Sequence, residues 1–317
     1  MKLPGSIQLI ERGWLSSNNV LFFEGESATL VDAGYVGHAP QTVELVKSAL
    51  AGRRSRIPGG QSPGRRLSRL INTHSHSDHI GGNAALQAAF GCKIVIPAGI
   101  ERMVSDWDTH ALLLDAAQQR GARFAHDAVI EAGSEFDMGG LTWQALPAPG
   151  HDMEALIYYC PEKRILISGD ALWRDGFGII FGELMGRKDA LPATRSTLEM
   201  IGRLGVDIVI PGHGAAFDDF DAALGRAFQR LASFEADGAR MGRNAVRACF
   251  TFNLLDLQRL REDELPAYLK SVPFFDHVNQ RMLGFSDEDF ASWLLGELLR
   301  SRSIELRDGW ILPTMAP

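Results

Sequence analysis

Short apolar runs recur along the first two thirds of the chain, and Gly, Pro, Asn or Asp residues separate most of them. Runs of this length, bounded by turn residues, predict β-strands. The predicted strands are 6–10, 19–23, 28–31, 67–72, 92–96, 141–146, 155–159, 164–167 and 206–210. Apolar residues at helical spacing predict helices at 40–50 and 83–90. Strands that alternate with helices indicate a layered α/β core.

The pattern becomes almost entirely helical in the last third of the chain. The predicted helices there are 221–236, 244–261, 264–270 and 287–300. The closing segment, 303–312, has two short strands around Asp308-Gly309, which is a strong hairpin signal. Helices followed by a hairpin indicate a mainly helical, winged-helix-like C-terminal domain. We therefore predict two domains, 1–217 and 218–317.

Composition and charge narrow the class of protein. The chain has 317 residues, of which 45% are hydrophobic and 22% charged, so it can bury a sizeable core. Its net charge of −7 argues against a dedicated nucleic-acid-binding protein, without excluding a local basic patch. The residues 1–10 lack the pattern of a signal peptide, and no stretch reaches the ~18 apolar residues of a membrane span. We expect a cytoplasmic protein with no membrane partner.

The three cysteines point the same way. Cys92, Cys160 and Cys249 lie far apart and form no C-x-x-C pair. This spacing predicts neither a disulfide framework nor a thiolate zinc site, and it fits a reducing compartment.

The strongest chemical signal is a cluster of His74, His76, Asp78 and His79. It follows a predicted strand and precedes a predicted helix, so the intervening loop can turn the side chains toward one point. A single histidine is more often a surface or core residue. Four ligand-type residues at this spacing favour a metal, because unpaired ionisable groups packed together are costly.

Three further candidates each follow a predicted strand: His151, Asp170 and His213. A glycine precedes each of them, which allows close backbone approach. Strand ends are where sites assemble in layered α/β folds. Each pair is common by chance, but together with the histidine cluster they indicate one site.

These motifs, in this order over about residues 1–217, resemble the metallo-β-lactamase-fold hydrolase superfamily. The resemblance implies an α/β fold, a four-layer αββα sandwich, with 1–217 as the catalytic domain. It also implies two metal ions joined by a bridging Asp170. The implied ligands are His74, His76 and His151 for one metal and Asp78, His79 and His213 for the other.

Such a centre implies hydrolysis by a metal-bridging hydroxide. Two divalent ions about 3.5–4 Å apart make a shared water acidic enough to ionise near neutral pH. Zinc is the favoured metal, although imidazole and carboxylate ligands also suit iron or manganese. Asp78 and Asp170 are the expected catalytic residues, since the first would orient the hydroxide and the second would keep the metals close.

Details of the motifs bear on the substrate class. A bridging Asp170 resembles the glyoxalase II, lactonase and ribonuclease Z branches rather than class B β-lactamases. The final motif, Pro-Gly-His-Gly at 211–214, departs from the Cys-Gly-His-Glu-Tyr of glyoxalase II and resembles a branch that includes a mammalian lactamase-like endoribonuclease. Asp152 stands where the family usually has threonine. Its carboxylate either supports a metal-bound histidine or, as we favour, belongs to a helix cap or a solvated turn.

The lack of a clear general acid favours a substrate whose leaving group needs no proton. We therefore expect a small ester-like substrate, most of all a thioester. A nuclease needs phosphate-binding cations and a general acid for its leaving group. The Arg-rich stretch 52–66 and the neighbouring Arg69 read best as a solvated surface, and no further histidine stands out as an acid. A thiolate leaves without protonation. The apolar segment 171–192 reads equally as a wall over the metals or as ordinary packing.

Other functions stay open. One alternative is a phosphodiesterase or endoribonuclease, which requires a basic surface that joins 53–69 to the C-terminal domain. Another is a mononuclear iron persulfide dioxygenase, which would not use His213 as a ligand. A third is a nucleic-acid-binding or oligomer-forming role for 218–317. The acidic start of the helix at 286–300 repels phosphate, so we expect this domain to cover the pocket or to form a homodimer contact.

Overall fold

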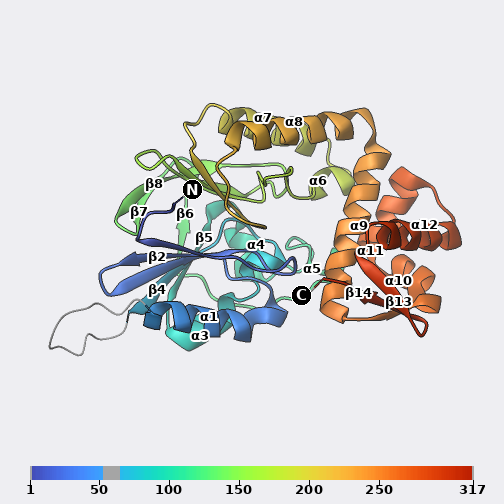
Figure 1. The fold of residues 1–317 in the computed structure, drawn as a ribbon, viewed down its shortest axis with the longest axis horizontal. Helices are drawn as coiled ribbons and strands as arrows, with labels where there is room; N and C mark the ends of the chain where they lie inside the picture. The colour runs from blue at the N-terminus through green and yellow to red at the C-terminus, as the bar shows by residue number, and fades with distance from the viewer. Residues whose placement is uncertain (1, 53–64, 316–317) are drawn as a thin grey trace.

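Two β-sheets stack face to face, and helices cover both outer faces (Figure 1). The computed structural model describes residues 2–52 and 65–315. Most of the Arg-rich stretch 52–66 lies outside the described residues. The arrangement is the predicted four-layer αββα sandwich, with a helical C-terminal part at one end of it.

The first sheet contains the N-terminal strands in sequence order. They are β1 (Ile7–Ile10), β2 (Asn19–Glu24), β3 (Ser27–Val31), β4 (Arg66–Ile71), β5 (Lys93–Pro97) and β6 (Ala128–Ile130). The pairs from β1 to β3 are antiparallel, and the pairs from β3 to β6 are parallel. Its outer face packs against α1 (Ala39–Gly52) and α3 (Asn83–Phe90).

The second sheet runs in the order β11, β10, β9, β8 and β7. These strands are β11 (Ile208–Pro211), β10 (Ile165–Gly169), β9 (Leu156–Cys160), β8 (Leu141–Pro147) and β7 (Glu135–Met138). Among its described strands, only the pair β10–β11 is parallel. The helices α7 (Ala190–Ile201) and α8 (Phe220–Ala236) cover its outer face. The sequence did not predict β6 and β7, because these short edge strands are partly exposed and lack a continuous apolar run.

Alternating side chains fill the layers of the sandwich. In β2, Leu21 and Phe23 pack under the helices of the first sheet, whereas Val20 and Phe22 pack between the two sheets. Successive side chains of a strand point to opposite faces, so a strand buried on both faces reads as a continuous apolar run. This is why the run at 19–23 was readable as a strand.

Shorter helical segments lie in the connections. They are η1 (Val36–His38), α2 (Ser77–Ile80), η2 (Ala98–Ile100), α4 (Glu101–Asp106), α5 (Leu114–Ala117) and α6 (Phe181–Leu184). In the C-terminal part, η3 (Glu262–Glu264) is a 3-10 turn and η4 (Asn279–Leu283) is a π-helical turn.

The C-terminal part, as far as the structure describes it, combines helices with a small sheet in the strand order β12, β14, β13. Its elements are α9 (Gly238–Leu257), β12 (Leu260–Arg261), α10 (Leu265–Ser271), α11 (Pro273–Val278), α12 (Asp287–Arg300), β13 (Ile304–Arg307) and β14 (Trp310–Pro313). The predicted helix 244–261 was wrong at both ends. The helix begins earlier at the N-cap Asp237, and Gln258, with a φ of 66°, ends it before β12 pairs with β14.

One apolar core joins the outer face of the second sheet to the C-terminal helices. It runs from Leu166 of β10 through Leu231 of α8 to Phe250 of α9 and Leu294 of α12. The domain boundary near 218 and the winged-helix-like arrangement therefore stay predictions. Among the described helices, none is both long and apolar enough to cross a membrane.

Candidate metal centre

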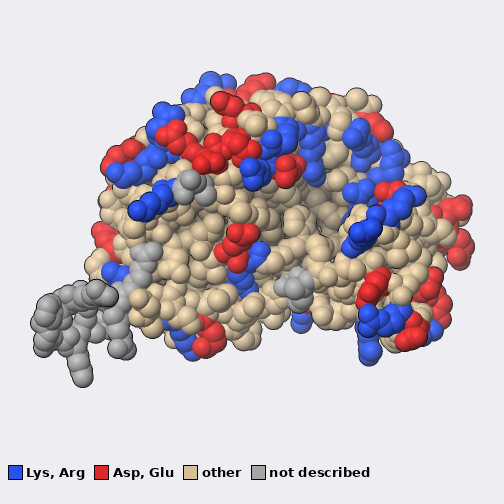
Figure 2. Space-filling view, in the orientation of Figure 1, with Lys and Arg blue, Asp and Glu red and all other residues tan. Residues whose placement is uncertain are grey.

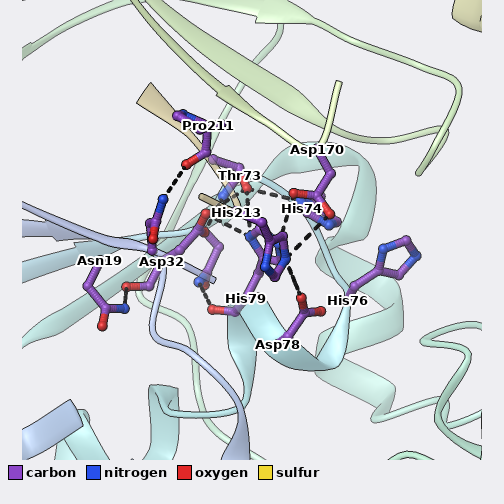
Figure 3. Close-up of polar contacts among 12 residues, drawn as sticks. Asn19, Asp32, Thr73, His74, His76, Asp78, His79, Asp170, Pro211 and His213 are labelled. Carbon is purple, nitrogen blue, oxygen red and sulfur yellow. Dashed lines mark hydrogen bonds and ion pairs between the residues drawn. The ribbon is translucent and has the colours of Figure 1, made fainter. Parts of the chain in front are cut away.

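Four connections at one edge of the sandwich carry the predicted site residues. The loop after β4 carries the histidine cluster, and the loops after β8, β10 and β11 carry the others. Because β8, β10 and β11 run in the same direction, their carboxyl ends meet at this edge. Figure 3 shows most of these side chains converging between the sheets. The structure brings together all seven predicted residues, His74, His76, Asp78, His79, His151, Asp170 and His213.

The seven side chains fall into two groups. The ligand atoms of His74, His76 and His151 lie within 4.8 Å of one another, and so do those of Asp78, His79, Asp170 and His213. Asp170 contacts both groups. Its Oδ2 lies 3.4 Å from Nε2 of His151, and its Oδ1 lies 3.4 Å from Nε2 of His79. A carboxylate in this position can share one cation with each group.

The ring nitrogens have the arrangement that a metal needs. Nε2 of His74 and Nε2 of His79 are buried and have no hydrogen-bond partner among the described residues. The opposite nitrogens of these two rings are occupied: Nδ1 of His74 lies 3.0 Å from Oγ1 of Thr73, and Nδ1 of His79 donates to Asp32 (2.8 Å). In His151, Nδ1 likewise donates to the carbonyl oxygen of Ile179 (2.6 Å). A proton held on Nδ1 leaves a lone pair on Nε2 for a metal ion. The donor set therefore fits two bound cations.

A further contact supports this reading. Nδ1 of His76 lies 2.6 Å from Nε2 of His151. Two ring nitrogens that face each other this closely need a shared proton or a cation between them. The lone pairs of Nδ1 in His76 and Nε2 in His151 therefore point to the same place, where a cation could bind both.

Burial sets the charge state of two histidines in the first group. Burial, and then the charges of neighbouring histidines, hold the pKa of His74 well below its usual value. Burial and the nearby His151 lower the pKa of His76 to about 4. Both rings are therefore neutral near pH 7. Metal binding requires neutral imidazole, so these two side chains need lose no proton when a cation enters.

The second group holds an excess of negative charge. Burial alone raises the pKa of Asp170, but the charges of His213 and His79 outweigh it, so the pKa lies well below the usual value. Burial alone lowers the pKa of His79, but Asp32, Asp78 and Asp170 raise it well above the usual value. Three carboxylates around one imidazole favour a positive charge at this point, which a divalent cation supplies.

Asp32 supports the centre and was not predicted from the sequence. It follows β3 and is 3% exposed. Its carboxylate accepts hydrogen bonds from the backbone N–H of Thr73 (2.9 Å), from Oγ1 of Thr73 (2.8 Å) and from Nδ1 of His79 (2.8 Å). Asp32 thereby orients a candidate ligand (Figure 3). The sequence feature that could have identified Asp32 is its place in Asp32-Ala33-Gly34, directly after a buried strand.

Asp152 acts on the backbone of the histidine loop. Its Oδ2 accepts hydrogen bonds from the N–H (3.1 Å) and the hydroxyl (2.7 Å) of Ser75, and its Oδ1 accepts one from the N–H of Glu154 (2.8 Å). The favoured interpretation as a turn residue describes the contact with Glu154. The contacts with Ser75 also hold the loop that carries His74 and His76.

The loop 13–19 closes the centre from the first sheet. The amide of Asn18 donates to the carbonyl oxygens of Pro211 (3.0 Å) and Gly214 (2.7 Å) on either side of His213. Trp14 from the same loop packs against the His213 ring, with ring centroids 5.1 Å apart. Trp14 also lines the cavity beside the candidate ligands, so this loop forms one edge of the pocket.

A small, mainly apolar cavity of about 210 Å³ opens onto the candidate ligands. The segment after Asp170 supplies much of its wall through Trp173, Phe177, Ile179 and Phe181. The indole N–H of Trp173 also donates to Oδ1 of Asp170 (3.1 Å). Other residues of this segment, such as Leu184, are buried in the core. The segment 171–192 therefore forms a wall of the cavity in one part and packs into the core in another, so each of the two interpretations describes part of it.

The helix α9 forms the opposite wall of the cavity. Its Ala248, Cys249 and Phe252 contribute apolar surface, and Asn244 contributes an amide. Arg230 of α8 is the one Lys or Arg among the described lining residues. The C-terminal part thus covers the candidate metal centre.

Gly212 is a position where any side chain would disturb the centre. A Cβ atom built at this residue would overlap Oδ1 of Asp170 and lie 3.0 Å from Cε1 of His79. We expect Gly212→Ala to displace Asp170 and to reduce the metal content of the purified protein. Gly225→Ala is the matched control, because a Cβ there meets nothing within 4 Å. Equal metal content in both variants would contradict this assignment.

Comparison with known proteins gives the family. The family model for the Metallo-beta-lactamase superfamily matches residues 12–213. The chain belongs to this superfamily. The matched region includes all seven residues of the candidate centre and ends at the last of them.

Curated relatives of this superfamily member match only part of the chain. One is the hydroxyacylglutathione hydrolase of Rhodopseudomonas palustris (strain HaA2), 28% identical over 148 residues, which are 47% of this chain and 51% of that protein. Another is the hydroxyacylglutathione hydrolase of Methylococcus capsulatus, 32% identical over 118 residues, 37% of this chain and 39% of that protein. The chain spans about half or less of the length of these relatives.

Solved structures show the same fold over a longer region. A metallo-beta-lactamase family protein from Thermus thermophilus has a TM-score of 0.57 at 17% identity, and the match covers 98% of this chain and 100% of that one. A metallo-beta-lactamase mutant from Cronobacter sakazakii has a TM-score of 0.52 at 18% identity, with 80% and 94% covered. At these identities the likeness concerns the fold alone.

Proposed function

We propose that this superfamily member is a dinuclear metal-dependent hydrolase that cleaves a small ester-like substrate, specifically a thioester. The observation that carries the proposal is the position of Asp170, whose two carboxylate oxygens reach both groups of candidate ligands. The two metals are divalent, with zinc favoured over iron or manganese by the nitrogen-rich donor set.

The proposed roles follow from the two groups. Two divalent ions supply Lewis acidity and lower the pKa of a shared water to near neutrality. His74, His76 and His151 would hold one ion, and Asp78, His79 and His213 would hold the other. Asp170, which contacts both groups, would be shared between the two sites. Asp78, whose Oδ2 lies 2.9 Å from Nε2 of His213, faces the centre and orients the attacking water.

The cavity favours a leaving group that needs no proton. Apart from the candidate ligands, the ionisable side chains among its described lining residues are Arg230 and Cys249. Arginine stays protonated, and burial raises the pKa of the Cys249 thiol, so neither is suited to act as a general acid near pH 7. A thiolate leaves unaided, whereas an alkoxide does not. The names of the curated relatives also support thioester cleavage.

Within the part of the chain that the structure describes, the contacts do not favour the alternatives. A nuclease needs a basic surface that joins 53–69 to the C-terminal part. Of the described arginines there, Arg65 donates to the carbonyl oxygen of Gly25, and Arg69 donates to that of Asp137, on the side of the first sheet away from α9 (Figure 1). A mononuclear iron oxygenase would not use His213, which lies in the second group.

Substrate competition tests the proposal. The zinc-loaded protein is assayed with a thioester, a lactone and bis-p-nitrophenyl phosphate, and with EDTA as the metal-free control. We expect kcat/KM for the thioester to exceed that for the phosphodiester by about 100-fold or more, since a missing general acid costs this much at an alkoxide. Activity confined to the phosphodiester would contradict the proposal.

Further proposals concern organisation and location. We propose that the chain divides into two domains, 1–217 and 218–317, and that the second has a winged-helix-like character. We also propose a homodimer, which sedimentation analysis would test.

A cytoplasmic location is supported by Cys92, Cys160 and Cys249, which are all buried and unpaired.

A further inference from the structure

A second hollow, of about 620 Å³, lies between α8 and α9 beside the metal cavity. Figure 2 shows Lys and Arg side chains gathered over the part of the surface where these two helices meet. We call this site the arginine hollow. The arginines that line it are Arg226, Arg230, Arg240, Arg243 and Arg247.

The helical spacing places these arginines on facing surfaces. Arg240, Arg243 and Arg247 occupy positions i, i+3 and i+7 of α9, which share one face of a helix. Arg226 and Arg230 occupy positions i and i+4 of α8 and line the same hollow. Like charges at such spacing destabilise a helix pair unless counter-charges offset them.

Carboxylates within the protein offset only part of this charge. Arg226 pairs with Asp175 and Asp219, Arg243 with Asp237, and Arg247 with Glu297. Among residues 2–52 and 65–315, no carboxylate pairs with Arg230 or Arg240. An unpaired cationic side chain in a hollow favours an anionic ligand.

Arg230 is the most informative of the five. Its Nε is buried without a hydrogen-bond partner among the described residues, and one of its terminal nitrogens donates to Oδ1 of Asn244 (2.8 Å). Burial, and then the charge of Arg247, lower the pKa of this guanidinium. The guanidinium lies over the rings of Phe177 (5.4 Å) and Phe234 (5.3 Å), and no described carboxylate pairs with it. Its charge is therefore available for an ion pair with an anionic ligand.

The arginine hollow and the metal cavity adjoin each other. Arg230 and Asn244 line both of them, and the amide oxygen of Asn244 accepts a hydrogen bond from Arg230. A ligand that spans this pair of side chains would place its reacting bond at the metal centre and its anionic end among the arginines.

Two aromatic side chains also line the arginine hollow, Phe234 of α8 and Trp293 of α12. The Trp293 ring itself stacks with the rings of Phe285 (5.7 Å, 17°) and Phe290 (6.0 Å, 3°), which hold it in place. Arginines beside aromatic side chains provide the two kinds of contact that nucleotides use, which are ion pairs with phosphate and ring contacts with the base.

We propose that the arginine hollow binds the phosphates and base of a nucleotide-bearing acyl thioester, of the coenzyme A class, whose acyl group enters the apolar metal cavity. The proposal rests on the proposed function, because it assumes that the cleaved bond is a thioester. Water adds to the carbonyl carbon, a C–O bond forms, and the C–S bond breaks. The products are a carboxylate, the nucleotide-bearing thiol and a proton.

Binding of adenosine 3′,5′-bisphosphate tests the subsite without the reaction, since this molecule carries neither a thiol nor an acyl group. Calorimetry on the full chain should show binding that Arg240→Gln and Arg243→Gln each weaken about tenfold or more, as expected for lost charged hydrogen bonds. Arg243→Lys should retain part of the affinity, and added salt should weaken binding in the wild type.

The matched control is Arg195→Gln, a partly exposed arginine of α7 that pairs with Glu235 outside the arginine hollow. This variant should bind the bisphosphate as the wild type does. Absence of binding, or equal binding in all variants, would overturn the proposal. So would tighter arginine-dependent binding of glutathione, which would indicate a carboxylate ligand, or of single-stranded RNA, which would indicate a polyanion.

Two matched thioesters separate this proposal from the proposed function. Acetyl-CoA and S-acetyl-N-acetylcysteamine carry the same reacting group, but only the first carries the nucleotide. We expect the ratio of their kcat/KM values to exceed about 100 and to fall about tenfold in Arg243→Gln, mainly through KM. Equal hydrolysis of both would overturn the subsite and leave the hydrolase proposal intact. Hydrolysis of neither, with arginine-dependent binding of the bisphosphate, would overturn the thioesterase and retain the nucleotide site.

Discussion

Asp170→Ala is expected to reduce the metal content of the protein and to lower kcat/KM for a thioester by roughly 10³-fold or more, as loss of metal-ion catalysis requires. The reason is the position of its carboxylate. Oδ1 and Oδ2 face different groups of candidate ligands, so the substitution removes a candidate ligand from both. Elemental analysis and steady-state kinetics on the same preparation would measure the two effects together.

An exposed aspartate supplies the control for this experiment. Asp207 begins the approach to β11, is exposed, and pairs with Arg164 away from the centre. Asp207→Ala should keep the wild-type metal content and activity, as expected for a surface ion pair of small energetic value. Full metal content in Asp170→Ala would show that this carboxylate does not bind the metals.

Asp32→Asn is expected to weaken one metal site by about 10- to 100-fold, the usual effect of losing an orienting partner of a ligand. The backbone N–H of Thr73 must keep an acceptor, so the oxygen of the introduced amide faces it and the amide nitrogen faces Nδ1 of His79. That nitrogen donates, so the His79 proton moves to Nε2, where it blocks the metal. Asparagine tolerates the φ of 58° at this position, so the fold is retained.

Metal titration by calorimetry would show the effect as one weakened binding phase beside one unchanged phase. Asp127→Asn is the control, because Asp127 also accepts a hydrogen bond from a backbone N–H, that of Ile94 (2.8 Å). Asp127 directly precedes β6 and is not one of the residues of the candidate centre. If Asp32→Asn bound both metals as tightly as the control, then the carboxylate would not set the proton position on His79.

The sequence was most informative where local spacing determines geometry. His74, His76, Asp78 and His79 lie within six residues, and the strand before them is buried on both faces at its end, so their convergence could be predicted. Asp32 could not be assigned in this way. Its partners, Thr73 and His79, lie 41 and 47 residues later, and only the parallel pairing of β3 with β4 brings them together.

The arginine hollow illustrates the same limit. Arg240 and Arg243 precede the predicted helix 244–261, so the sequence did not place them on one helix face with Arg247. Their role depends on the packing of α8 against α9, which brings Arg226 and Arg230 to the same hollow and places this hollow beside the metal cavity. The edge strand β7 was missed for a related reason, because only its partner β8 makes it a strand.

The most direct test of a dinuclear hydrolase is the number and identity of metal ions bound to each chain. Native mass spectrometry of the purified protein, with elemental analysis of the same sample, would provide both. We expect two divalent ions per chain, zinc foremost, with the second ion lost in His213→Ala. A single iron per chain that is unaffected by His213→Ala would contradict the account and favour the oxygenase.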